Sequence, residues 1–382
     1  MKVHILVFAL VTIMAEALCA QMPSSTIRYT NMSAIEKIGA DSLTANQREA
    51  MQQIAKGNAY HDNGMFHDAI KCYKAADSLF PGNATVNYEL GYSFMMLKQL
   101  DSAVFYAKRS IEIEPGELSF SLVGDVFDYM GVVDSALKYY DLGLSFYPKS
   151  YHLLYNKGVA LFTYKRVDEA FIVARQSVKY TRQHEGSYFL MAQISAKKGL
   201  WIDFFANGLY ANFVGNTNGR MDYVTKYFRE LMFVFARRMA IFDEEVLNRP
   251  LLDIHRNWAS STVYRFIDSH STFGKNDYNL LDSLENDDKT YEILVDLGSF
   301  AMRESVKLPY DFELKPFYKQ IVEGGFEDLY MRIVFRNMNQ VAFDSWKMMN
   351  EKRFKKFYDT IVFPFWNGEQ SLKAPVLIER PN

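Results

Sequence analysis

Cysteine is nearly absent from this sequence of 382 residues, which contains only Cys19 and Cys72. Cys19 lies in an N-terminal segment that we expect to be cleaved off, residues 1–20. A chain that has lost this segment keeps one cysteine and cannot form an internal disulfide. Cys72 falls on an expected helix beside Tyr73, where a small buried side chain is the usual role of a free cysteine. Nothing around Cys72 favours a lowered thiol pKa, and we therefore expect neither a redox nor a nucleophilic role for it.

An excess of basic residues is also missing. The chain has 43 Lys and Arg against 45 Asp and Glu, which gives a formal net charge of −2. Proteins that bind the phosphate backbone of nucleic acids need clustered positive charge. We therefore expect no nucleic-acid partner.

The sequence has no apolar run of about 20 residues, the length that a membrane-spanning helix requires. Its longest apolar stretch, Ile5 to Met14, follows Lys2 and precedes the small residues Ala17 to Ala20. This order is typical of a secretory signal peptide, and we expect cleavage after Ala20. A lipid anchor on Cys19 is the less favoured alternative, because Leu18 stands where lipoprotein signals carry Gly, Ala or Ser.

Catalytic signatures are absent as well: the chain contains no HExxH, GxSxG, GxxxxGK or GxGxxG pattern. The glycine-rich stretch Gly215–Gly219 lacks the lysine of a phosphate-binding loop and is expected to form a turn. The most suggestive ligand set is split between the two ends of one expected helix, about 20 Å apart, and cannot hold a single ion. That set is Asp253, His255, Asp268 and His270. We expect no metal and no cofactor.

Several columns of residues recur at steps of 33 or 34 residues. Glycine and alanine columns would let helices approach closely, a column of large residues would fill the space beside them, and a proline column would end helices. The glycines are Gly57, Gly91, Gly124 and Gly158, and the alanines are Ala69, Ala103, Ala136 and Ala170. The large residues are Tyr60, Phe94, Phe127 and Leu161, and the prolines are Pro81, Pro115 and Pro148.

This pattern resembles the tetratricopeptide repeat (TPR), a helix–turn–helix unit of 34 residues. The resemblance covers four units, from Ala50 to about Arg182. It departs from the family where the fourth unit has Arg182 instead of proline. A degenerate fifth unit is indicated by Ala192 at the glycine column and Phe204 at the alanine column.

The resemblance implies an all-α fold, a TPR solenoid of four clear repeats and a degenerate fifth, followed by a C-terminal helical domain. Nothing in the sequence alternates with period two for long, which agrees with this fold class. The expected divisions are a signal peptide at 1–20, a leader at 21–45, the array at 46–182, the fifth repeat or cap at 183–216 and the helical domain at 217–382.

Within the C-terminal domain, helical patterns are separated by short breaks. We expect breaks at Leu308-Pro309 and at Gly324-Gly325, and one long final helix from Phe326 to about Lys352. The helices expected before these breaks cover Met221–Phe242, Pro250–Asp268 and Asp287–Ser305.

In TPR folds the first helix of each repeat lines a concave groove with its positions two, five, nine and twelve. Carried over to this chain, the expected binding residues are Asn58, His61, Tyr88, Tyr92, Met95, Asp125, Asp128, His152, Tyr155 and Phe162. The subclass that clamps a C-terminal carboxylate is excluded, because Ile54 replaces its lysine. The groove is instead aromatic and Met-rich in units two and four, and acidic in unit three.

We therefore expect a non-enzymatic scaffold of the bacterial cell envelope, periplasmic, outer-membrane-associated or extracellular, that binds a protein or peptide partner. Three alternatives remain open at this point. The protein's own leader or C-terminal helices could fill the groove, a small-ligand or enzyme site could lie in residues 217–382, or the solenoid could drive self-association.

Overall fold

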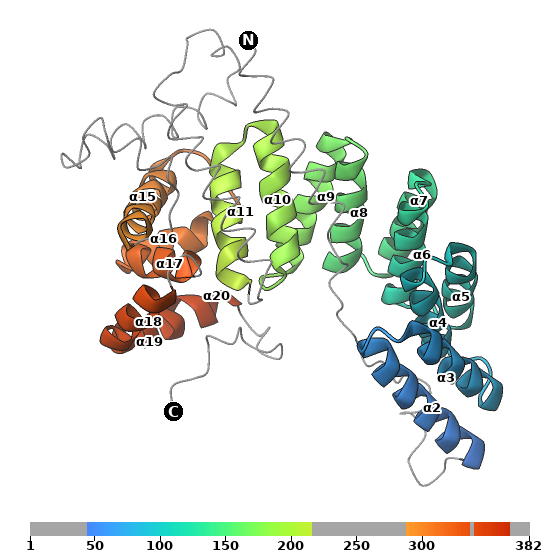
Figure 1. Cartoon of the computed structure of the whole chain (residues 1–382). Coiled ribbons are helices and arrows are strands. Elements are labelled where there is room, and N and C mark those ends of the chain that lie inside the picture. The colour runs from blue at the N-terminus through green and yellow to red at the C-terminus, as the bar shows by residue number, and fades with distance from the viewer. Residues whose placement is uncertain (1–43, 216–287, 337–339, 367–382) are drawn as a thin grey trace. The chain divides into compact units, whose positions relative to one another are not determined.

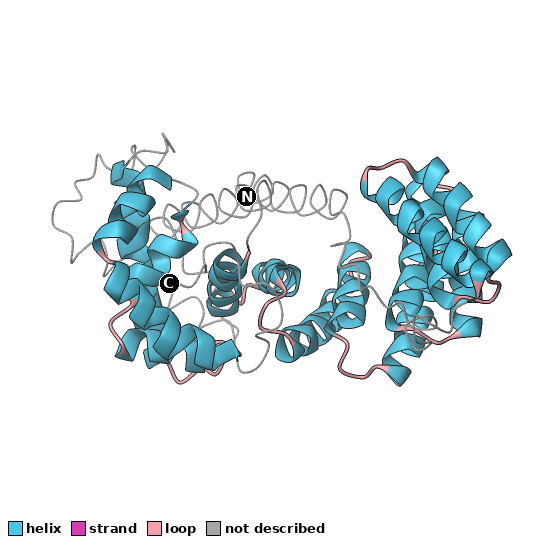
Figure 2. Cartoon of the chain, turned by 90° about the horizontal axis from the view of Figure 1, so that it is seen from below, coloured by secondary structure: helices cyan, strands magenta, loops and turns pink. Residues whose placement is uncertain are grey.

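The computed structural model describes residues 44–215, 288–336 and 340–366. These residues form helices joined by short connections, without a strand among them (Figure 2). The chain divides into two compact units, 1–180 and 181–382. The expected helices at 221–242 and 250–268 and the signal and leader segments lie outside the described residues.

The first unit contains four antiparallel helical hairpins (Figure 1). Each hairpin corresponds to one expected repeat, and each second helix also contacts the first helix of the next hairpin. The pairs are α2 (Ala45–Asp62) with α3 (Phe66–Leu79), α4 (Ala84–Met96) with α5 (Leu100–Ile113), α6 (Glu117–Tyr129) with α7 (Val133–Phe146), and α8 (Tyr151–Thr163) with α9 (Val167–Tyr180).

The same turn closes every hairpin. Its central residue adopts a left-handed backbone conformation, with φ between 59° and 76°. The following amide donates back to a carbonyl in the last turn of the first helix, as from Gln99 to Phe94 at 2.9 Å, so the helix ends in a Schellman-type cap. The left-handed residues are Gly64, Lys98, Gly131, Lys165 and, in a fifth hairpin, Gly199.

The glycine and alanine columns lie where the helices of a hairpin meet. Ala69, Ala103, Ala136 and Ala170 are fully buried. A Cβ on Gly91 would meet the Ala107 amide nitrogen at 3.0 Å and the Leu122 side chain at 3.1 Å. The repeat columns are therefore packing positions, as the sequence predicted.

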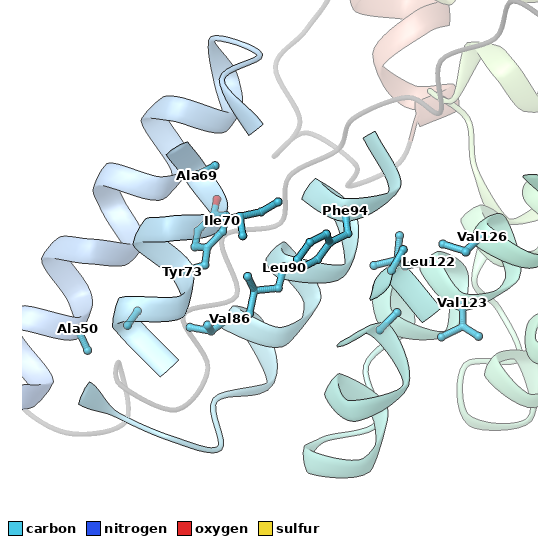
Figure 3. Close-up of a cluster of buried hydrophobic side chains, with 13 residues drawn as sticks. Ala50, Ala69, Ile70, Tyr73, Val86, Leu90, Phe94, Leu122, Val123 and Val126 are labelled. Carbon is cyan, nitrogen blue, oxygen red and sulfur yellow. The ribbon is translucent and has the colours of Figure 1, made fainter. Parts of the chain in front are cut away.

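Large apolar side chains fill the space between successive hairpins (Figure 3). Tyr73 and Ile70 of α3 lie against Leu90 of α4, and Phe94 of α4 lies toward Leu122 of α6. Because each hairpin buries its apolar side against its neighbours, the units stabilise one another along the array.

The second unit begins with the fifth hairpin, α10 (Glu185–Lys198) and α11 (Trp201–Val214). Its remaining described helices are α15 (Asp288–Lys307), α16 (Lys315–Glu323), α17 (Glu327–Val334), α18 (Gln340–Met349), α19 (Glu351–Phe357) and α20 (Phe363–Trp366), with a π-helical turn at Tyr358–Val362. Aromatic side chains from α11, α16 and α17 form the core between them, including Tyr210, Phe213, Phe317 and Tyr330.

The expected breaks at Leu308-Pro309 and Gly324-Gly325 are present, but the single long final helix is wrong. The chain from 326 onward is divided instead into α17, α18, α19 and α20. The buried Arg336 explains the first division, because its guanidinium donates to the carbonyl of Ile333 at 2.6 Å and to that of Gly215 at 2.7 Å. The Ile333 carbonyl is one that a continuing helix would use, and the bond to Gly215 holds Arg336 against the end of α11.

Candidate functional site

The first helices of the hairpins form the inner layer of the array. Helix α6 contacts both α4 and α8, whereas contacts between successive second helices are much sparser. We define the first-helix face by positions two, five, nine and twelve of α2, α4, α6 and α8. All ten residues predicted for binding lie on these helices.

Aromatic rings stack along this face in the first two repeats. The Tyr92 ring lies 4.9 Å from the His61 ring and 6.3 Å from the Tyr88 ring, centroid to centroid. His61 is buried, and its Nδ1 is 2.9 Å from Ser93 Oγ, which joins α2 to α4. Tyr88, Tyr92 and Met95 are half-buried, so this part of the face is already organised by its own contacts.

A tyrosine of the second helix reaches the first-helix face in repeats one and three. The Tyr73 hydroxyl donates to Asn58 Oδ1, and the Tyr140 hydroxyl donates to Asp125 Oδ1, each at 2.7 Å. Both rings are buried and pass directly over the repeat's glycine. Asn58 and Asp125, two of the predicted residues, are thus held at position nine by the same arrangement.

Asp125 is the centre of a polar network between repeats three and four. Besides Tyr140, the Asn156 Nδ2 donates to its carboxylate at 3.1 Å and also to Ser121 Oγ at 2.8 Å. Burial raises the pKa of Asp125 to about 7, with a further contribution from the charge of Asp128, while the donated hydrogen bonds act in the opposite direction. A substantial fraction of this carboxyl is therefore protonated near neutral pH.

Asp128 lies three residues after Asp125 on the same helix and is half-buried. Its Oδ1 atom is buried without a hydrogen-bond donor. Burial raises the pKa of this carboxyl as well. The Tyr164 hydroxyl lies close by, 3.5 Å from the backbone oxygen of Asp128. Repeat three therefore presents two carboxyl groups that are partly removed from water and carry like charge.

In repeat four the predicted residues differ in exposure. Phe162 is half-buried, whereas Tyr155 and His152 are buried, and the His152 ring lies 4.1 Å from the Tyr151 ring. Burial lowers the pKa of His152 to about 4, so this imidazole is neutral at physiological pH. His152 and Tyr155 are structural in the described state, and their use by a partner stays a prediction.

Sequence reasoning missed two contributors to the network around Asp125, namely Tyr140 and Asn156, and also missed Tyr164, which lies beside Asp128. Tyr140 belongs to a second helix and Asn156 occupies position six, neither of which the groove positions include, and Tyr164 lies beyond position twelve. A signal for Tyr140 was present, because Tyr73 occupies the equivalent column two repeats earlier. The contact of Asn156 depends on the rotation of α8 against α6, which the sequence does not reveal.

Within the described ranges, no three His, Cys, Asp or Glu side chains are grouped to hold a metal ion. The candidate set at residues 253–270 lies outside them. The same part of the chain contains no helix with the length and apolar character needed to cross a bilayer.

The family comparison matches the tetratricopeptide repeat model to residues 54–117, which cover most of the first two repeats. Curated proteins give no match to the chain. Among solved structures, PilF of Pseudomonas aeruginosa is similar at 12% identity over 63% of this chain and 99% of its own, with a TM-score of 0.43.

Two further solved structures show a similar likeness. A tetratricopeptide repeat protein from Parabacteroides merdae is 12% identical over 72% of this chain and 99% of its own, with a TM-score of 0.38. A thermophilic TPR protein of Thermus thermophilus is 14% identical over 42% and 89% of the two chains, also with a TM-score of 0.38.

Tetratricopeptide repeats in general act as scaffolds for protein interaction, and this is the broad role that the match at residues 54–117 supports. The matched model, the recurring Gly and Ala columns and the repeated hairpin turn agree with one another. The chain therefore contains tetratricopeptide repeats, which the family model matches over residues 54–117.

Proposed function

We propose that this protein is a non-enzymatic interaction scaffold of the bacterial cell envelope that binds a peptide or protein segment along its first-helix face. The observation that carries the proposal is the stripe of apolar residues on α4. Tyr88, Tyr92 and Met96 are spaced by four residues and so lie on one side of the helix; the two tyrosines belong to the first-helix face, and Met96 directly follows its last residue, Met95. Tyrosine and methionine suit adaptable recognition of a partner.

The exposure along this stripe increases toward the end of α4. Tyr88 and Tyr92 are half-buried, and Met96 is 44% exposed. The equivalent end of α6 carries Tyr129, which is 58% exposed. A partner segment crossing α4 and α6 would cover these side chains, and their removal from water would contribute to binding.

The proposed envelope location rests only on the signal-peptide pattern of residues 1–20. Residues 1–20 have the charged start, apolar centre and small-residue end of a signal peptide. This part of the proposal has its own test, given in the Discussion.

The binding proposal is tested with the full mature chain and an array of immobilised 12-residue peptides of varied sequence. We expect wild-type protein to bind a subset of the peptides and Tyr92→Glu to weaken that binding by about thirtyfold or more, the effect of losing an aromatic anchor. The control is Phe105→Glu, which places the same charge on an exposed side chain of α5.

Melting temperatures of both variants separate binding from packing. Tyr92→Glu should melt only slightly below wild type, because the ring is only partly buried and packs at the edge of the core cluster. A large drop, together with no peptide bound by the wild type, would show that the stacked rings serve only as core and would overturn the proposed function.

A further inference from the structure

The two carboxyl groups of repeat three have no cationic partner in the described part of the chain. Asp125 receives hydrogen bonds from the neutral groups of Tyr140, Asn156 and Ser121. Asp128 has a buried Oδ1 without any donor. No lysine, arginine or histidine among the described residues forms an ion pair with either of them.

Ionising both carboxyl groups at once is unfavourable here unless a cation compensates their charge. Burying a carboxylate costs free energy when no opposite charge compensates it, and a second carboxylate one helical turn away adds repulsion. Burial raises the pKa of both Asp125 and Asp128, and the charge of Asp128 adds to the effect on Asp125. A positively charged group placed between the two carboxyl groups would offset the desolvation and the repulsion together.

The side chains next to the carboxyl groups are apolar and accessible. Tyr129 follows Asp125 by four residues on the same side of α6 and is 58% exposed. Tyr164 is 36% exposed beside Asp128, and Met96 at the end of the neighbouring α4 is 44% exposed. Aromatic faces accept the methylene stem and the charge of lysine or arginine.

Resting on the proposed function, we propose that the occupant of this face is a partner segment that carries a lysine or arginine flanked by apolar residues. The basic side chain pairs with Asp125 and Asp128. The flanking apolar residues pack on an apolar rim made of Met96, Tyr129 and Tyr164. Charge complementarity selects this occupant, because an acidic or neutral segment would leave both carboxyl groups uncompensated.

The test uses the peptide array with one position fixed as arginine, lysine, norleucine or glutamate and apolar residues beside it. We expect the wild-type chain to bind the arginine and lysine peptides at least tenfold more tightly than the norleucine peptides. Asp128→Asn, which keeps the shape and removes the charge, should abolish that preference. Asp101→Asn removes the same charge from an exposed position on α5 and should leave it intact.

Each outcome decides a separate point. If peptides bind but the basic residue gives no advantage, or if Asp128→Asn retains the advantage, the inference fails and the proposed function stands. If no peptide binds, the proposed function fails with it.

The alternative occupants are examined by placing the photo-crosslinker p-benzoylphenylalanine at Tyr129 of the full chain. We expect a crosslink to the arginine peptide. A crosslink within the chain, or to a second copy of it in the presence of that peptide, would overturn the inference.

Discussion

At the scale of single residues, glycine has two different functions in the repeats. In repeats one and three it leaves room for a tyrosine ring, since a Cβ on Gly57 would lie 2.6 Å from Tyr73. In repeat two the helix backbones themselves approach, with the Ala103 carbonyl 3.2 Å from the same position on Gly91. The neighbours of Gly91 cannot move without shifting the helix.

Gly91→Leu should therefore destabilise the protein by about 1–3 kcal/mol, because it overpacks a rigid contact. Urea unfolding of the two proteins measures the difference. Gly116→Ala is the control, since Gly116 precedes α6 at φ −110° and a Cβ there meets nothing closer than 3.4 Å. A stabilised Gly91→Leu protein would contradict the assigned register, because an exposed helical glycine gains stability from such a change.

Asp125 makes stability depend on pH in an unusual direction for an aspartate. Its pKa in the folded protein, about 7, is higher than the ordinary value of 3.8. The folded state therefore binds the proton more tightly than the unfolded state between these values, and this stabilisation is lost as the pH rises from about 4 to about 7.

Asp125→Asn should remove that loss. We expect the free energy of unfolding of the wild type to fall more between pH 5 and pH 8 than that of the variant, by on the order of 1 kcal/mol or more. Asp101→Asn, on an exposed part of α5, should keep the wild-type slope. Equal slopes for wild type and Asp125→Asn would mean that the carboxyl is as well solvated as an ordinary surface aspartate.

At the scale of elements, the hairpin turns differ in the residue at their left-handed position. Repeats one, three and five place glycine at the left-handed position, whereas repeats two and four place Lys98 and Lys165 there. A left-handed conformation costs a residue with a Cβ roughly 1–2 kcal/mol. The even-numbered turns are therefore strained.

Lys98→Gly should stabilise the protein by about 0.5–1 kcal/mol, because it relieves that strain at a residue outside the helices. The same substitution at Lys138, an exposed position inside α7, should destabilise it by about 1 kcal/mol. Thermal unfolding shows whether each substitution raises or lowers the stability of the protein. A loss of stability in both variants would show that the turn at Lys98 is not strained.

The sequence predicted the helices that depend on a local pattern. It failed where a contact between distant residues lies at the end of a helix. The glycine and alanine columns predicted four hairpins because each column is a contact within or between adjacent helices. The final helix was predicted as one piece because its apolar residues continue at helical spacing. Helix α17 instead ends at Val334, next to Arg336, whose guanidinium donates to the carbonyls of Ile333 and of Gly215, the latter more than one hundred residues away.

The same distinction holds for the candidate site. Positions nine and twelve identified Asp125 and Asp128 without any structure. The tyrosine hydroxyl that fixes Asp125 comes from α7, and the amide of Asn156 comes from the next repeat. Those contacts follow from how helices are rotated against one another, and a linear pattern does not contain that information.

At the scale of the whole molecule, the signal peptide predicted for residues 1–20 bears on where the protein is located. We expect the protein, expressed in a bacterial host with residues 1–20 intact, to be exported and to begin at Gln21. N-terminal sequencing of the processed protein checks this. A retained Met1 would contradict export, and a lipid on Cys19 would identify a membrane anchor instead.

Odd and even repeats alternate in two of their residues, so the structural period of the array is two repeats. Tyr73 and Tyr140 stand in odd repeats where Ala107 and Ala174 stand in even ones, and the turn residues alternate in phase with them. Excising one internal repeat would bring two odd or two even repeats together, whereas excising a consecutive pair would keep odd and even repeats alternating. The array can therefore change its length in steps of two repeats more readily than in steps of one.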